Sequence, residues 1–196
     1  ARALGQGGDP GPVVLDFPTD VLRASVPAVT QLAEHFVARQ RPVLQPCPVQ
    51  AAQAMELLWS ARRPLVISGR GARGAGAELT RLLDACGALY LDTGESRGLV
   101  SDAHPLVVAA MRGSVMADAD LIVTLGRRLD FQRAFGSPAV FGKARLIRIA
   151  DAPSELRDNR RGRVEMLAQP KAALAAIVAA AGSRALALDR EWAAAV

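Results

Sequence analysis

The sequence has few of the residues that carry most enzymatic chemistry. Its 196 residues include two histidines, two cysteines and only 4% aromatic side chains. The cysteines, Cys47 and Cys86, lie far apart, and neither His35 nor His104 has the spacing of a metal ligand. No Ser/His/acid or Cys/His set can be assembled from these groups. We therefore expect no catalytic residue and no metal ligand in this chain.

Long apolar runs and tracts of one charge are also missing. No segment resembles a signal peptide or is apolar over a membrane-spanning length, and the two cysteines are expected to be reduced. These features favour a cytoplasmic protein without a membrane partner. The net charge of +5 is dispersed. Its densest cluster, residues 157–163, is interrupted by Asp158 and holds no aromatic residue that would stack on bases, so we expect no nucleic-acid partner.

The most informative segment that is present is residues 64–74, PLVISGRGARG. A short apolar run ends in a Gly-x-Gly-x-x-Gly pattern and helix-like sequence follows, which is typical of a strand, a tight turn and a helix N-terminus. Residues 74–87 then repeat apolar side chains at helical spacing. Residues 88–91 form a second apolar run that ends in Asp92. The pattern predicts a β-α-β unit.

Two interpretations of this unit remain open. In the first, Gly69, Gly71 and Gly74 bind a diphosphate at the helix N-terminus and Asp92 binds a ribose, as in an NAD-binding dehydrogenase domain. In the second, the glycines only allow a strand and a helix to pack closely. Glu95, Asp92 and Asp130 are then surface or capping carboxylates.

The whole chain predicts an α/β fold with a doubly wound, Rossmann-like parallel sheet of about six strands flanked by helices. Apolar runs at residues 64–68, 88–91, 121–126, 146–149 and 164–167 are the expected strands. A further strand at residues 13–17 is expected outside this sheet. Helices are predicted from 49 to about 60 and from Pro170 to Ala181.

Changes in composition divide the chain into four parts. Residues 1–22 form an N-terminal remnant, and the proline-rich residues 23–48 form a linker. Residues 49–181 make the Rossmann-like domain, and residues 182–196 begin a linker to a further domain. Because the first residue is not Met, we interpret the chain as a piece of a longer protein.

The order of several phrases resembles thiamine-diphosphate-dependent enzymes of the acetolactate synthase type. Residues 12–20, PVVLDFPTD, are similar to the end of the pyrimidine-binding domain. The phrases that resemble the central domain are RPLVISGRG at 63–71, TGESRG at 93–98, ADLIVTLGRRLD at 119–130 and PSEL at 153–156. Together they cover nearly the whole chain in the order of the family.

The resemblance implies a parent enzyme that binds thiamine diphosphate and Mg²⁺ through domains absent from this chain. In the family, a glutamate of the N-terminal domain and a Gly-Asp-Gly motif of the C-terminal domain serve that cofactor, and neither is present here. The implied partners are therefore the missing N- and C-terminal domains, in a full-length homodimer or homotetramer. This central domain is expected to have no activity alone.

The resemblance implies three possible states of this domain, because some central domains of the family hold FAD, some hold an adenine nucleotide such as ADP, and many hold nothing. The matching phrases supply nine candidate contacts: Gly69, Arg70, Gly71, Thr93, Gly94, Glu95, Gly126, Arg128 and Asp130. Each also has an ordinary structural explanation as a turn, cap or surface residue. Nucleotide-binding members carry acids where this chain has Ala150 and Ala152. We therefore expect an empty crevice, and a ligand-free scaffold domain is the third alternative.

Three further features favour one branch of the family. They are the phrase AAMRGS at 109–114, residues 128–131, and the basic run after Glu155. All are more similar to hydroxyacyl-CoA lyases and oxalyl-CoA decarboxylases than to acetolactate synthase proper. The firm expectation remains an acetolactate synthase-like parent.

Overall fold

The structure is a computed structural model that describes residues 11–25, 42–158, 160–182 and 188–194. The chain divides into two compact units, Ala1–Pro42 and Val43–Val196. In the first unit the predicted strand at residues 13–17 does not form, and its backbone pairs with no other described strand. A strand needs a neighbour to satisfy its N–H and C=O groups, so an isolated segment gains nothing by adopting one. A short helix, α1 (Thr19–Arg23), follows instead.

The second unit is built on a parallel sheet of five strands in the order β2-β1-β3-β4-β5. The strands are β1 (Pro64–Ser68), β2 (Leu89–Leu91), β3 (Leu121–Leu125), β4 (Arg145–Ala150) and β5 (Val164–Leu167). The predicted parallel α/β class is confirmed, and every strand in this unit arises from an apolar run expected to form one. The count of about six is corrected to five, because next to β2 only a single parallel bridge, from Tyr90 to Val107, is present in the described chain.

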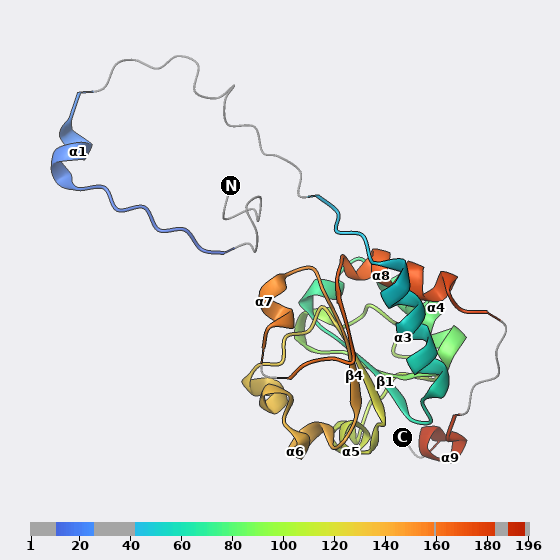
Figure 1. The fold of residues 1–196 in the computed structure, drawn as a ribbon. Coiled ribbons are helices and arrows are strands. Elements are labelled where there is room, and N and C mark those ends of the chain that lie inside the picture. Colours follow the sequence, from blue (N-terminus) through green and yellow to red (C-terminus); the bar gives the residue numbers. More distant parts are fainter. Residues whose placement is uncertain (1–10, 26–41, 159, 183–187, 195–196) are drawn as a thin grey trace. The chain divides into compact units, whose positions relative to one another are not determined.

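Helices cover both faces of the sheet (Figure 1). On one face lie α3 (Pro48–Ser60), α4 (Gly76–Cys86) and α8 (Pro170–Ala179). On the other lie α5 (Arg112–Asp118), α6 (Pro138–Phe141) and α9 (Arg190–Ala194). Alternate strand residues supply the two cores: Val66 packs with the first group, and Leu65 and Ile67 pack with the second.

Periodicity correctly identified the buried face of the main helices. In α4 the buried residues are Leu79, Leu82, Leu83 and Cys86. The short helices α5, α6 and α9 were not predicted, since four to seven residues carry too few periodic positions to signal a helix. A last short helix, α7 (Pro153–Leu156), follows β4.

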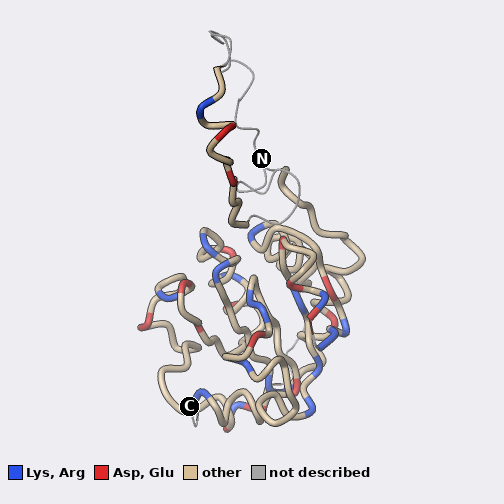
Figure 2. The backbone as a smooth tube through the Cα atoms, turned by 90° about the vertical axis from the view of Figure 1, so that its left-hand side faces the viewer, with Lys and Arg blue, Asp and Glu red and all other residues tan. Residues whose placement is uncertain are grey.

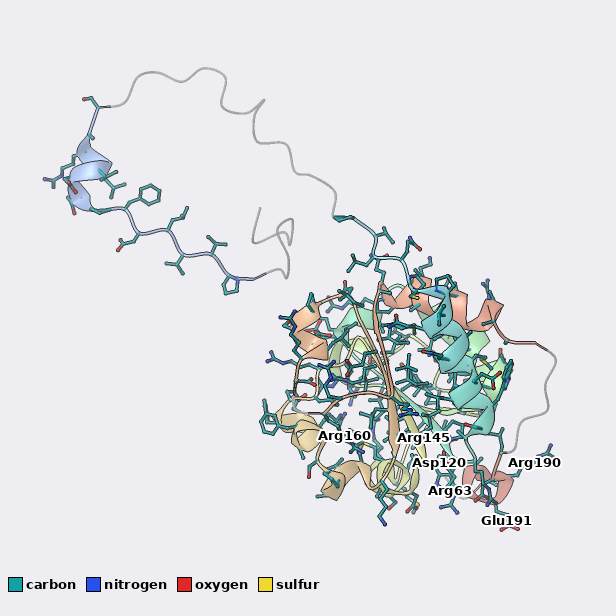
Figure 3. All side chains as sticks on the ribbon, viewed as in Figure 1. Arg63, Asp120, Arg145, Arg160, Arg190 and Glu191 are labelled. Carbon is teal, nitrogen blue, oxygen red and sulfur yellow. The ribbon has the colours of Figure 1, made fainter. Side chains whose placement is uncertain are left out.

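The ends of the second unit are tied to the sheet. The C=O of Leu44, a residue of the predicted linker, accepts a hydrogen bond from the N–H of Gln169 at 2.9 Å. At the amino edge of the sheet, Asp120 accepts hydrogen bonds from the backbone N–H groups of Arg62 and Arg63 at 2.8 and 3.0 Å. Arg63, which lies near Asp120 at this edge (Figure 3), also pairs with Asp189, just before α9, at 2.9 Å.

Candidate functional site

The strand order reverses between β1 and β3. From β1 the chain adds β2 on one side of the sheet, and it then crosses over to add β3 on the other side. In open parallel α/β sheets, ligands bind outside the carboxyl ends of the strands at such a point. Gly69 follows β1 and Gly126 follows β3. The topology therefore brings the two predicted glycine segments together at the expected position.

The glycines at this point are in direct backbone contact with each other. A Cβ atom added at Gly126 would lie 2.5 Å from the Cα of Gly71, and one added at Gly71 would lie 2.8 Å from the Cα of Gly126. Gly126 also has a positive φ of 54°. Only glycine allows both the close approach and this backbone conformation without strain. The glycines here serve loop packing.

Backbone N–H groups of the glycine segment bond inside the protein. The N–H of Gly69 donates to the C=O of Leu125 at 2.9 Å, and that of Gly71 donates to the C=O of Gly126 at 3.0 Å. Arg70, another predicted contact, is exposed and opens a short 3₁₀ helix, η1 (Arg70–Ala72). Helix α4 begins only at Gly76. The motif therefore does not form the direct turn into an α-helix that phosphate binding uses.

Thr93, Gly94 and Glu95 lie beside this turn, in and before a 3₁₀ helix, η2 (Gly94–Ser96). The hydroxyl of Thr93 donates to the C=O of Ser68 at 2.6 Å, and its N–H donates to the hydroxyl of Ser96 at 2.8 Å. Gly94 has a φ of 49°. Glu95 forms an exposed ion pair with Arg73. Thr93 is thus a buried capping residue, and Glu95 joins two loops at the surface.

A buried hydroxyl network that the sequence analysis did not identify lies beneath these loops. The Ser68 hydroxyl is 2.6 Å from that of Tyr90 and donates to the hydroxyl of Ser96 at 2.8 Å. All three side chains are at most 1% exposed. Burial raises the pKa of Tyr90 above its ordinary value of 10.0, so the phenol stays protonated at neutral pH. The network satisfies polar groups at the carboxyl ends of β1 and β2.

After β3, the structure gives a larger role to Arg127 than to the predicted Arg128, which is exposed. The Arg127 guanidinium donates to both carboxylate oxygens of Asp130, at 3.0 and 3.1 Å, and to the side-chain oxygen of Gln132 at 2.9 Å. Asp130 also caps the 3₁₀ helix η3 (Phe131–Gly136) by accepting from the N–H of Gln132. The spacing of Arg127 and Asp130 was visible in the sequence but was not used.

The carboxyl end of β4 carries a second arginine–aspartate pair, Arg148 and Asp158, with side chains only 1% and 8% exposed. Arg148 also donates to the C=O of Arg160 at 2.8 Å. Ala150, the position at which related nucleotide sites carry an acid, is the last residue of β4 and is 3% exposed. The buried Asp158 carboxylate at this end is committed to Arg148.

Several positive charges face the loops beyond β2 and β3. Arg112 pairs with Asp92 at 3.0 Å. Burial, and then the charges of Arg127 and Arg112, lower the pKa of Arg133. Basic and acidic residues are interspersed over the second unit (Figure 2).

Within the described ranges, no three His, Cys, Asp or Glu side chains come close enough to hold a metal ion. No described helix is both long and apolar enough to cross a membrane.

Residues 51–177 match the family model described as "Thiamine pyrophosphate enzyme, central domain". The chain belongs to this family. Oxalyl-CoA decarboxylase of Escherichia coli (strain K12) is 34% identical over 82% of this chain and 29% of that enzyme. The 2-hydroxyacyl-CoA lyase 1 of Mus musculus is 32% identical over 82% of this chain and 28% of that enzyme. Acetolactate synthase 2 of Zea mays is 30% identical over 87% of this chain and 28% of its own length.

The chain therefore spans less than a third of the length of each of these relatives. Among solved structures, benzoylformate decarboxylase from Polynucleobacter necessarius aligns over 93% of this chain and 35% of its own, with a TM-score of 0.67 and 21% identity. That likeness supports the fold. None of these comparisons supports the alternative of an NAD-dependent dehydrogenase.

The residues between β1 and β3, where the strand order of this thiamine pyrophosphate enzyme central domain reverses, do not fit FAD or ADP. The N–H groups of Gly69 and Gly71 already have acceptors, and their loop is packed against Gly126. Ala150 offers no carboxylate to a ribose or adenine. A cavity of about 340 Å³ does open beside β2, lined in part by Asp92 and Arg112, but its lining includes no residue of the glycine turn.

Proposed function

We propose that this chain is the central domain of a thiamine-diphosphate-dependent enzyme that breaks a carbon–carbon bond in a CoA thioester. Its reaction is decarboxylation of an oxalyl-type thioester or cleavage of a 2-hydroxyacyl-CoA. The observation that carries the proposal is the 34% identity to oxalyl-CoA decarboxylase over 82% of this chain. The 2-hydroxyacyl-CoA lyases of Mus musculus and Oryza sativa, at 32% and 33%, support the same branch. A 2-oxoacid carboligase of the acetolactate synthase type is the second candidate, supported by 30% identity over 87% of the chain.

In this proposal the central domain is a scaffold and the chemistry takes place elsewhere in the parent. Thiamine diphosphate would supply a nucleophilic carbon for this chemistry, and the N- and C-terminal domains would hold it together with Mg²⁺. The contribution of the described residues is rigidity. Asp120 joins the amino ends of two strands, and Arg148 with Asp158 joins loops at the opposite edge. A rigid central domain would hold the two catalytic domains at a fixed separation.

The division into an N-terminal remnant, a linker, the domain and a second linker remains a prediction, as does a homodimeric or homotetrameric parent in the cytoplasm. Absence of FAD and ADP from the crevice is also proposed. Its support is the poor fit of the glycine turn and of Ala150 to a nucleotide.

The test is a substrate comparison with the full-length protein that contains this domain. Purified protein with thiamine diphosphate and Mg²⁺ is given oxalyl-CoA, a 2-hydroxyacyl-CoA or pyruvate, and products are followed by chromatography. We expect turnover of a CoA thioester that depends on thiamine diphosphate. Turnover of pyruvate alone would favour the second candidate. The isolated 196-residue chain is expected to give no product with any of the three, and thiamine-dependent turnover by it would contradict the scaffold role.

A further inference from the structure

The side chain of Arg127 lies directly against the glycine turn. A Cβ atom built at Gly69 would lie 2.8 Å from both the Cα and the Cδ of Arg127. The apolar stem of the arginine therefore covers Gly69, the first glycine of the motif, whose lack of a side chain would otherwise let a ligand approach the backbone closely. A glycine that faces a ligand would have open space at this position.

The guanidinium of Arg127 is fixed in place by three hydrogen bonds. Two go to the carboxylate of Asp130 and one to the side-chain oxygen of Gln132. The side chain is only 11% exposed, and its charge is balanced by Asp130. The face formed by Nη1 and Nη2 is therefore occupied by a carboxylate and not open to a phosphate, while Nε is buried without a hydrogen-bond partner. The Arg127 side chain therefore fills the space beside Gly69, and we call it the filling group below.

Two neighbouring features point in the same direction. Gly71 and Gly126 close the space between the β1 and β3 loops by backbone contact. Ala150 removes the acid that would bind the far end of a nucleotide. The first two features lie together where the loops after β1 and β3 meet, and Ala150 lies at the end of β4, so the three together remove the diphosphate contact, the space and the ribose contact that a nucleotide needs.

We infer that Arg127 is a specificity-determining residue that occupies the diphosphate position beside Gly69 and thereby excludes FAD and ADP from this domain. The inference concerns the domain itself and does not require the proposed reaction of the parent. The substrate comparison can therefore fail while this inference holds, and the reverse is equally true.

The experiment is a calorimetric titration of the 196-residue chain with ADP and with FAD. The decisive variant is Arg127→Ala/Asp130→Asn, which removes the filling group and leaves the net charge unchanged. Asn at position 130 keeps an oxygen that can cap the N–H of Gln132. The matched control is Arg161→Ala/Glu165→Gln, which removes another arginine–carboxylate pair outside the nine candidate contacts, also without a change in net charge. Circular dichroism and urea unfolding check that each variant is folded.

We expect the wild-type chain and the control to bind ADP and FAD with dissociation constants above about 1 mM, and the decisive variant to bind at least about tenfold tighter. Adding Ala150→Asp should tighten binding by about a further tenfold through a charge-assisted hydrogen bond. Micromolar binding by the wild-type chain would overturn the inference, as would a folded decisive variant with no gain. If that variant does not fold, Arg127→Ala alone keeps Asp130 as a cap, and the same gain is required of it at high salt, where the unpaired carboxylate is screened.

Discussion

Two arginine–aspartate pairs lie at the carboxyl edge of one sheet, and they differ in burial and in reach. Arg148 and Asp158 are 1% and 8% exposed, whereas Arg127 and Asp130 are 11% and 27% exposed. Asp158 also accepts a hydrogen bond from the N–H of Leu129 at 3.0 Å, so the first pair connects β4 with the loop after β3. The second pair lies within three residues of one loop.

The difference indicates that the Arg148–Asp158 pair stabilises the fold, whereas the Arg127–Asp130 pair contributes mainly to the local structure of one loop. A buried charge whose partner is removed cannot regain water, so a pair that joins distant segments is costly to break. A local and partly exposed pair contributes little to stability. It can be changed without loss of the fold, which makes the Arg127 position available for determining what binds.

The largest effect is expected from Asp158→Ala, which leaves the Arg148 charge buried without its carboxylate. We expect a loss of about 3–5 kcal/mol in the free energy of unfolding, measured by urea denaturation. Asp130→Ala is the matched change at the other pair and should cost less, about 1–2 kcal/mol, because it removes a partly exposed ion pair and the cap of η3. Equal losses for the two variants would remove the distinction on which the comparison depends.

A second prediction sharpens the comparison by showing that packing, rather than charge, orders the loops around Arg127. Gly126→Ala places a Cβ against the backbone of Gly71 at a positive φ, whereas Gly94→Ala has a similar φ of 49° and open space around it. Left-handed backbone costs roughly 1–2 kcal/mol for a non-glycine residue, and overpacking adds about 1–3 kcal/mol. We expect Gly126→Ala to be less stable than Gly94→Ala by about 2 kcal/mol in urea unfolding. Similar losses would show that the two loops can move apart.

The fold was largely predictable because parallel strands buried on both faces are continuous apolar runs, as in residues 64–68 and 121–125. The position of the candidate site followed from the same runs, since strand ends locate loops. Gly69, Gly71 and Gly126 were each identified, and the structure brings them together. The strand expected at residues 13–17 did not form, because a β-strand depends on a partner that local sequence does not describe.

The purpose of the site could not be predicted from the motif. Glycines that allow a ligand to approach and glycines that allow another loop to approach have the same sequence pattern. Arg127 decides between them through its contact with Gly69, which depends on a loop 58 residues away in the chain. The hydroxyl network of Ser68, Tyr90 and Ser96 was missed for the same reason, since these side chains come from β1, β2 and η2 and meet only in the folded chain.

The last expected effect is a slope with pH rather than a fixed loss, and it concerns buried groups that stay neutral, in contrast to the charged pairs. Burial raises the pKa of the Cys86 thiol in α4 from 9.0 to about 11, and it raises the pKa of Tyr90 as well. Between pH 9 and pH 11 the unfolded chain has therefore lost a proton that the folded chain still holds. Stability is fully present below pH 9 and decreases as the pH rises towards 11, by at most about 1.4 kcal/mol per pH unit for the thiol.

Urea unfolding at intervals from pH 8 to pH 10.5 measures this slope, and Cys86→Ala is the variant that tests its origin. The substitution removes packing at every pH, so its constant loss of stability is ignored and only the slope is compared. We expect the alkaline slope to be shallower in Cys86→Ala, while Cys47→Ala, which changes an exposed thiol, leaves it as in the wild-type chain. The remaining slope should decrease again in Tyr90→Phe. An unchanged slope in Cys86→Ala would contradict the raised pKa, because it would mean that the thiol loses its proton at the same pH in the folded and the unfolded chain.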